Sequence, residues 1–341
     1  MLKNGIRIKK SGLSLRQVRN FSFQLPSIST LDQVKAANSD YDGLFKNSTV
    51  KQIWYERGQH LLDGLNQTME DHGLDKTGTD LQTIITGLIS KPQLYGVYSY
   101  SASLYTLQFF LESLKPNNTS EISTPTADTL LKTPALNEYT NVPTNPVLVD
   151  WINQLFGSID EFRTLLLNSA RGIKGDGYVW LVAKLTVSGK TENTKYIYKE
   201  LSVTNTYNAG VVDDGLRSGQ VTKLKGQKQA RLDNLRKRAD ELSQLEGSST
   251  QNTELQAEIA QLEDDINLKE LGTVEEAEDI TVYANKKLVP LLAIDASPRN
   301  YLLDYGVFGK NKYLDNLWES IDWDVVAKRM PPRSKQFFSI D

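Results

Sequence analysis

The stretch LLAIDASPRNYLLDY (291–305) contains the clearest chemical feature of the chain, a single carboxylate, Asp295, at the end of an apolar run. A carboxylate in such a place can act as a metal ligand or as a general acid. Four residues later, where a second polar ligand would complete such a site, stands Arg299. A guanidinium stays protonated in proteins and repels a metal cation. The pair therefore raises the question of whether this site works.

The chain has few sulfur or imidazole ligands for a transition metal. The chain has no cysteine, which excludes disulfides, thiolate metal sites and cysteine nucleophiles. Its two histidines are His60 and His72, so three imidazole ligands cannot be assembled from this sequence. We expect both to be ordinary surface residues. The glycines of GIKGDG (172–177) are better explained by backbone turns than by phosphate binding, and we expect no small-molecule substrate.

The first residues are basic and free of acidic side chains up to Asp32. Interleaved apolar residues would allow a basic amphipathic helix, and RNFS (19–22) resembles a matrix-protease cleavage site. Residues 1–21 are therefore predicted to be a mitochondrial presequence, and the protein is predicted to act in the mitochondrial matrix. The alternative is a basic arm that touches RNA. No window approaches the roughly 18 apolar residues of a membrane span, so no membrane association is expected.

Apolar residues recur at helical spacing through the first third of the chain. The pattern predicts helices at 50–70, 78–90 and 99–116, and so an N-terminal helical hairpin domain over residues 22–116. Residues 117–146 are rich in Asn, Thr, Ser and Pro, which predicts a surface linker.

A C-terminal α/β domain is predicted over residues 147–341. It opens on two helices broken near Gly157. β-Branched and aromatic runs then predict strands at 177–187, 195–207 and 279–295, followed by closing helices. Helices followed by strands and further helices give an α+β fold class.

Between the second and third strands lies a predicted coiled-coil insertion, residues 211–279. Its apolar residues repeat at steps of three and four on both sides of GSSTQN (247–252), which indicates a helical hairpin. The first arm is basic and the second acidic. The arms could neutralise one another, or they could form a surface for a partner; the sequence leaves both open.

Five blocks in the right order resemble the iron/manganese superoxide dismutase family. LLAIDASPRNYLLDY resembles the signature LLxIDVWEHAYYLxY, and YLDNLWESIDWDVVAKR resembles the family's closing helix. LQFFLESLKP resembles NHTFFWxxLxP, and GQHLLDGLNQ resembles HHQxYVNNLN. GSIDEFRTLLLNSARGIKGDGYVWLV resembles the junction between the helical domain and the sheet. The resemblance implies a helical hairpin domain followed by a three-stranded antiparallel sheet with helices.

The family chemistry needs a redox metal held by three histidines and one aspartate. The resemblance places the histidine positions on Ile53, Leu107 and Arg299, and the aspartate on Asp295. Aliphatic side chains have no lone pair to donate, and one carboxylate alone does not make a transition-metal site. We therefore expect no metal, no cofactor and no catalytic residue. Asp295 and Arg299 could form an ion pair, or Arg299 could turn outward.

The chain closely resembles the dismutase-like proteins in the small subunit of fungal mitochondrial ribosomes. It implies a structural role in mitochondrial translation, with ribosomal proteins as partners and a second dismutase-like chain in a heterodimer. The glutamate that links subunits in the family is Pro298 here, and the histidine that it meets falls on Arg57, so the family's symmetric linkage cannot form. The alternatives are an active or vestigial mitochondrial superoxide dismutase and a matrix scaffold away from the ribosome.

The charge distribution favours protein contacts over extensive RNA contacts. The net charge is −3, and residues 211–279 carry nine basic and sixteen acidic side chains, so the rest of the chain is close to neutral beyond its basic start. A protein threaded through rRNA would be strongly basic. RNA contacts are therefore expected to be local. The candidate rRNA contacts are Lys228, Arg231, Arg236, Lys237, Arg238, Lys328, Arg329, Arg333 and Lys335.

Overall fold

The computed structural model describes residues 23–74, 80–88, 91–131, 138–185, 198–213, 220–243, 255–260 and 288–331. The predicted presequence (1–21) lies outside these residues, as do Arg333 and Lys335. The described part has the predicted α+β composition, with helices before and after one antiparallel sheet.

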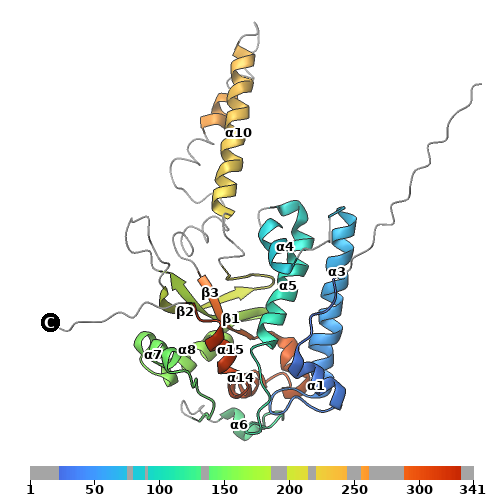
Figure 1. Cartoon of the computed structure of the whole chain (residues 1–341), viewed down its shortest axis with the longest axis vertical. Helices are drawn as coiled ribbons and strands as arrows, with labels where there is room; N and C mark the ends of the chain where they lie inside the picture. Colours follow the sequence, from blue (N-terminus) through green and yellow to red (C-terminus); the bar gives the residue numbers. More distant parts are fainter. Residues whose placement is uncertain are drawn as a thin grey trace, which may run out of the picture.

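The N-terminal half is helical, as the apolar spacing predicted. Its elements are α1 (Ser29–Ala37), α2 (Asn47–Val50), η1 (Lys51–Glu56), α3 (Arg57–Asp71), α4 (Leu81–Leu88), η2 (Pro92–Leu94) and α5 (Tyr95–Leu111). η1 is a π-helical turn that joins α2 to α3 without a break. α3 and α5 lie side by side and form the hairpin (Figure 1). Leu61, Leu62 and Leu65 are buried on α3, which explains the apolar spacing in the sequence.

The C-terminal half contains the sheet. Its elements are α7 (Pro146–Phe156), α8 (Ile159–Gly172), β1 (Gly177–Leu185), β2 (Tyr198–Tyr207), β3 (Leu288–Asp295), η4 (Pro298–Asn300), α13 (Leu302–Tyr305), α14 (Lys310–Glu319) and α15 (Trp323–Lys328). Gly157 separates α7 from α8 with φ +91°, a value that L-residues rarely adopt. The strand order is β2-β1-β3 with both pairs antiparallel, so the central strand β1 is hydrogen-bonded on both edges.

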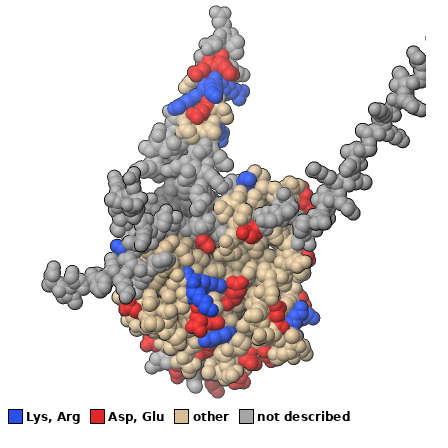
Figure 2. Space-filling view, viewed as in Figure 1, with Lys and Arg blue, Asp and Glu red and all other residues tan. Residues whose placement is uncertain are grey.

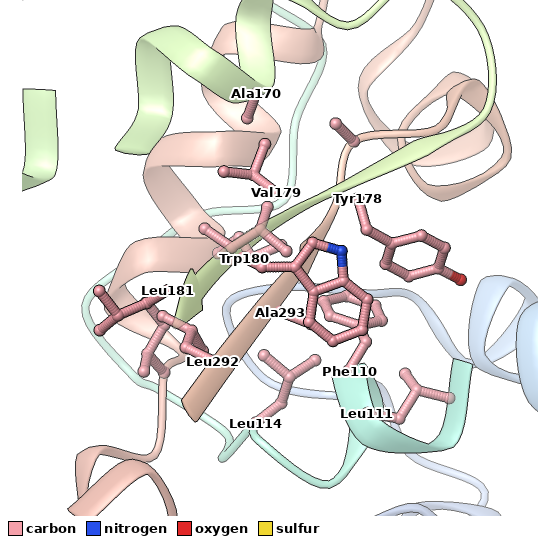
Figure 3. Close-up of a cluster of buried hydrophobic side chains, with 14 of the residues drawn as sticks. Phe110, Leu111, Leu114, Ala170, Tyr178, Val179, Trp180, Leu181, Leu292 and Ala293 are labelled. Carbon is pink, nitrogen blue, oxygen red and sulfur yellow. The ribbon is translucent and has the colours of Figure 1, made fainter. Parts of the chain in front are cut away.

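Both faces of β1 are covered, which is why its run from Tyr178 to Ala183 is buried throughout. Figure 3 shows Trp180 directed toward Phe110 of α5, while Val179 lies beside Ala170 of α8. Alternate residues of a strand point to opposite faces, so α5 covers one face and α8 the other. The sheet is thereby fixed against the N-terminal helices through one continuous core.

The predicted linker is partly structured. It contains the short helix α6 (Ala127–Leu131). Its last residues are tied to the C-terminal helices: the Thr140 and Asn141 backbone amides each donate to Glu319 at 3.0 Å, and Asn141 Nδ2 donates to the Trp318 carbonyl at 2.9 Å.

The insertion contains α10 (Gln220–Ser243), which extends away from the sheet in Figure 1. Leu232 and Ala239 of α10 pack on Ile259 of the short helical stretch at 255–260, so the two arms face one another as the predicted hairpin requires. Val211 and Val212, which the predicted boundary assigned to the insertion, are buried in the body of the protein. None of the described helices is both long enough and apolar enough to span a membrane.

Candidate functional site

Asp295 ends β3 and is paired in the ladder with Tyr178 of β1. Its carboxylate is completely buried. Oδ1 accepts the Ser297 backbone N–H at 3.0 Å, and Oδ2 lies 3.2 Å from Arg299 Nη2. Burial acts to raise the pKa of Asp295, but Arg299 and the hydrogen bonds from Ser297 outweigh it and hold the pKa below its ordinary value. The carboxylate is therefore ionised and already neutralised within the chain.

Arg299 turns inward, which decides between the two alternatives that the sequence left open. Its Nη2 contacts Asp295, and its Nη1 lies 2.6 Å from Asp176 Oδ2. The side chain is 20% exposed, whereas that of Asp176 is 49% exposed. Burial acts to lower the pKa of Arg299, but Asp295, Tyr178 and Asp176 outweigh it and raise the pKa above its ordinary value. The guanidinium thus joins the end of β3 to the residue before β1.

The two other predicted ligand positions are apolar and buried. Ile53 lies in the π-helical turn η1 with 2% of its surface exposed, and Leu107 lies on α5 with none exposed. Next to Leu107, Thr106 hydrogen-bonds the side chain of Tyr178, the ladder partner of Asp295. π-helical turns are rare and are concentrated at functional sites. Here η1 places Ile53 in the core, and the aliphatic side chain of Ile53 has no lone pair to donate to a metal.

Arg57 is the fourth charged side chain of this region, one turn after Ile53. Burial, and then the neighbouring positive charge of Arg299, lower the pKa of Arg57. Its Nη1 is buried and has no hydrogen-bond partner among the described residues. Two guanidinium groups therefore approach one another, and both carboxylates of the region, Asp295 and Asp176, contact Arg299.

This arrangement does not fit a dismutase metal. Of the four predicted ligand positions, only Asp295 has a donor for a metal, and that carboxylate is held by a permanent cation. Within the described ranges, no group of three or more His, Asp or Glu side chains is placed to hold a metal ion. His60 and His72 are exposed, as predicted. We therefore derive no metal-dependent step for this site.

Only part of the network around Asp295 could be predicted from the sequence. Asp295 and Arg299 are four residues apart, so an ion pair between them could be considered from the sequence alone. Asp176 and Arg57 are more than a hundred residues away from them. Arg57 was predicted only as the position of the family's interface histidine, and Asp176 was not predicted to join the site. A signal for Asp176 was available, because it is a charged residue between two glycines directly before a buried strand.

The candidate RNA contacts fall into distinct groups. Arg231 pairs with Glu258 of the facing arm at 2.6 Å, and Figure 2 shows charges of both signs together on this part of the hairpin. Arg236, Lys237, Arg238 and Lys328 are exposed, while the side chain of Lys228 lies outside the described part.

The prediction for Arg329 is corrected. Its guanidinium lies 3.7 Å from the ring centroid of Phe109, donates to Ser113 Oγ at 2.6 Å and pairs with Glu112 at 3.4 Å. With 17% of its side chain exposed, Arg329 points into the protein because an aromatic face and several acceptors meet it there. Its guanidinium is therefore already engaged by groups of the protein itself.

Comparison with protein families identifies the second half of the chain. Residues 143–211 and 248–329 match the C-terminal domain of iron/manganese superoxide dismutases. The matched residues include all three strands together with Asp295 and Arg299, and the unmatched interval contains α10. The protein therefore has a superoxide dismutase-like C-terminal domain with an insertion. Ile53 and Leu107 lie outside the match.

Proposed function

We propose that this protein, whose second half is a superoxide dismutase-like domain, is a non-enzymatic structural component of the small subunit of the mitochondrial ribosome. It takes no metal and no other cofactor. It contributes a protein surface that binds neighbouring ribosomal proteins, with local rRNA contacts through the exposed basic residues of α10.

The observation that carries the proposal is the ion pair between Asp295 and Arg299. Dismutase chemistry requires an ion that alternates between two oxidation states, held by lone-pair donors. Here a guanidinium occupies the position of one such donor and neutralises the one carboxylate at 3.2 Å. Ile53 and Leu107, at the two other positions that the resemblance assigns to ligands, are buried and offer no lone pair.

The ribosomal assignment rests on the resemblance described above and on charge. The acid-free basic start of the chain supports import into mitochondria. The near-neutral body supports contacts with proteins rather than burial in rRNA. The hairpin supports the same conclusion in part, because Arg231 of the basic arm is neutralised by Glu258 of the facing arm.

An exposed apolar surface beside the network supports a heterodimer with a second dismutase-like chain. Val307 and Phe308 are 71% and 72% exposed, and Leu302 and Leu303 are 43% and 55% exposed. Four large apolar side chains within seven residues are costly to leave in water. They follow Arg299 closely in the sequence. The positive charge of Arg299 helps to lower the pKa of Arg57. A partner that covers this surface would shield the apolar side chains from water. If it also placed a carboxylate beside Arg57, the guanidinium would gain a hydrogen-bond partner.

The ribosomal role is tested by sedimentation. A tagged full-length chain in a mitochondrial extract should co-sediment with the small subunit and stay bound in high salt. A chain that remains in the soluble fraction would point instead to a matrix scaffold. Stoichiometric manganese or iron in the purified protein, together with dismutase activity, would refute the non-enzymatic assignment.

The heterodimer is tested separately by native mass spectrometry of the co-purified complex. Phe308→Ser should reduce recovery of the dismutase-like partner, because an exposed apolar contact is lost. Tyr95→Ser is the matched control, since Tyr95 is 60% exposed at the start of α5. A stable homodimer of the isolated chain would contradict the heterodimer.

A further inference from the structure

A cleft of about 630 Å³ opens between the first described residues, α4, α5 and the start of β3. Its floor is apolar, since Leu62, Leu104 and Pro290 line it and are buried. Phe23 and Tyr105 line it as well and are only partly buried. The volume is in the range of about 300–1,000 Å³ that is usual for binding pockets. The cleft lies apart from the Asp295 network, none of whose residues lines it.

The charged residues that line the cleft are mostly acidic. Among the described residues, Asp80, Glu112 and Asp213 are balanced by one cation, Arg329. Arg329 is held against Phe109 and Ser113, and shares Glu112 at 3.4 Å. Asp80 accepts the Thr83 backbone N–H at 2.6 Å, and Asp213 accepts from the Tyr105 hydroxyl at 3.3 Å. Three carboxylates and one guanidinium give the described lining of the cleft a net charge of about −2.

We propose that this cleft binds a short basic segment of a partner protein, one that carries apolar side chains between its Lys and Arg residues. An apolar floor takes up aliphatic or aromatic side chains, and carboxylates at the rim attract the cations beside them. A nucleic acid is disfavoured, because its phosphates would meet the same carboxylates. The volume admits a few side chains and not a folded domain. This inference does not depend on the ribosomal assignment.

Fluorescence anisotropy with the full-length chain tests the charge dependence. The probe is the labelled peptide GKLRFKLG, which should bind, while the anionic peptide GELEFELG should not. Asp80→Asn with Glu112→Gln should weaken binding about fivefold, since two exposed charges at about 0.5 kcal/mol each amount to about 1 kcal/mol. Asp63→Asn with Asp71→Asn removes the same charge from exposed positions on α3 and should leave binding unchanged.

A second measurement locates the probe without neutralising the cleft. Because the chain has no cysteine, a single Gln82→Cys variant places one thiol at the rim. A probe whose cysteine is activated as a 2-pyridyl disulfide should exchange with this thiol, form a mixed disulfide and release 2-thiopyridone. The exchange should be much faster than with Gln59→Cys, whose thiol would lie on the exposed face of α3.

Three results would overturn the proposal. Equal binding by the Asp80/Glu112 variant and its control would remove the role of the cleft carboxylates. Equal disulfide rates at the two cysteines would place the probe elsewhere. Binding that appears only when residues 1–21 are deleted would assign the cleft to the chain's own basic segment in place of a partner.

Discussion

Replacing Arg299 by methionine tests the ion pair on which the functional proposal depends. Methionine keeps much of the length and the apolar stem of arginine but removes the guanidinium. The buried carboxylate of Asp295 would then lose its contact at 3.2 Å and keep the Ser297 N–H at 3.0 Å. We expect a folded but clearly less stable protein.

The size of the loss follows from burial. Removing one partner of a buried ion pair typically costs about 3–5 kcal/mol of unfolding free energy, because an uncompensated charge remains. Arg299 is 20% exposed and the Ser297 hydrogen bond survives, so we expect the lower end, about 3 kcal/mol. The contact with Asp176 adds little, since that carboxylate is 49% exposed. Asp295→Asn with Arg299→Met should recover part of the loss, because no buried charge is left.

The pH dependence distinguishes a lost ion pair from lost packing. In the native chain the pKa of Asp295 is lowered, so its stabilisation is present above the unfolded pKa of about 3.9 and disappears as pH falls through the folded pKa. Without Arg299, burial raises the pKa of Asp295, and protonation on acidification then relieves the penalty. The difference between native chain and variant should therefore be largest near neutral pH and shrink toward pH 4.

Urea unfolding at several pH values measures both effects. The matched packing control is Leu302→Met, an exposed position close to Arg299 in the chain, which should change the unfolding free energy little at any pH. A loss below about 1 kcal/mol for Arg299→Met, or a loss independent of pH, would refute the ion pair as the element that neutralises Asp295.

Three further predictions concern the metal positions and one turn. The combined variant Ile53→His, Leu107→His and Arg299→His should acquire manganese or iron, measured by elemental analysis, because with Asp295 it supplies four donors; no uptake would mean that these positions do not converge. Chelation by EDTA should not change the urea midpoint of the native chain, whereas a lowered midpoint would reveal a structural metal. Gly157→Ala should cost about 1–2 kcal/mol in urea unfolding, since φ is +91° there, while Gly172→Ala in open space at the end of α8 should be neutral or stabilising; equal effects would contradict the strained turn.

The element types of the described part could be read from the sequence because each carries its own local signal. β1 was evident from a run of β-branched and aromatic residues, and the break between α7 and α8 was evident from Gly157. The start of the insertion was less accurate. Val211 and Val212 look like any apolar pair in a polar region, and only the tertiary packing that buries them assigns them to the body.

The candidate site was predictable where its residues are close in sequence. Asp295 and Arg299 share one short segment, so their pairing could be posed as a question in advance. The contact of Arg299 with Asp176 depends on β3 lying beside β1, and an antiparallel register cannot be read from either strand alone. The inward position of Arg329 was missed for a similar reason. A basic segment near the end of the sequence looks exposed, and the ring of Phe109 that Arg329 contacts comes from α5.

The geometry at the end of β3 supports our proposal that this chain needs no metal. A carboxyl group buried there can stay ionised only if a cation neutralises it, whatever the source of the cation. In the dismutases that this domain resembles, a bound ion supplies the charge, and folding is then coupled to the supply of metal. Here Arg299 supplies it from four residues away, on the same η4 segment that follows the strand. The cation is therefore present in every copy of the chain as soon as β3 and η4 form. The structural role that we propose would benefit from that independence, since it would not require the open coordination position that metal catalysis needs.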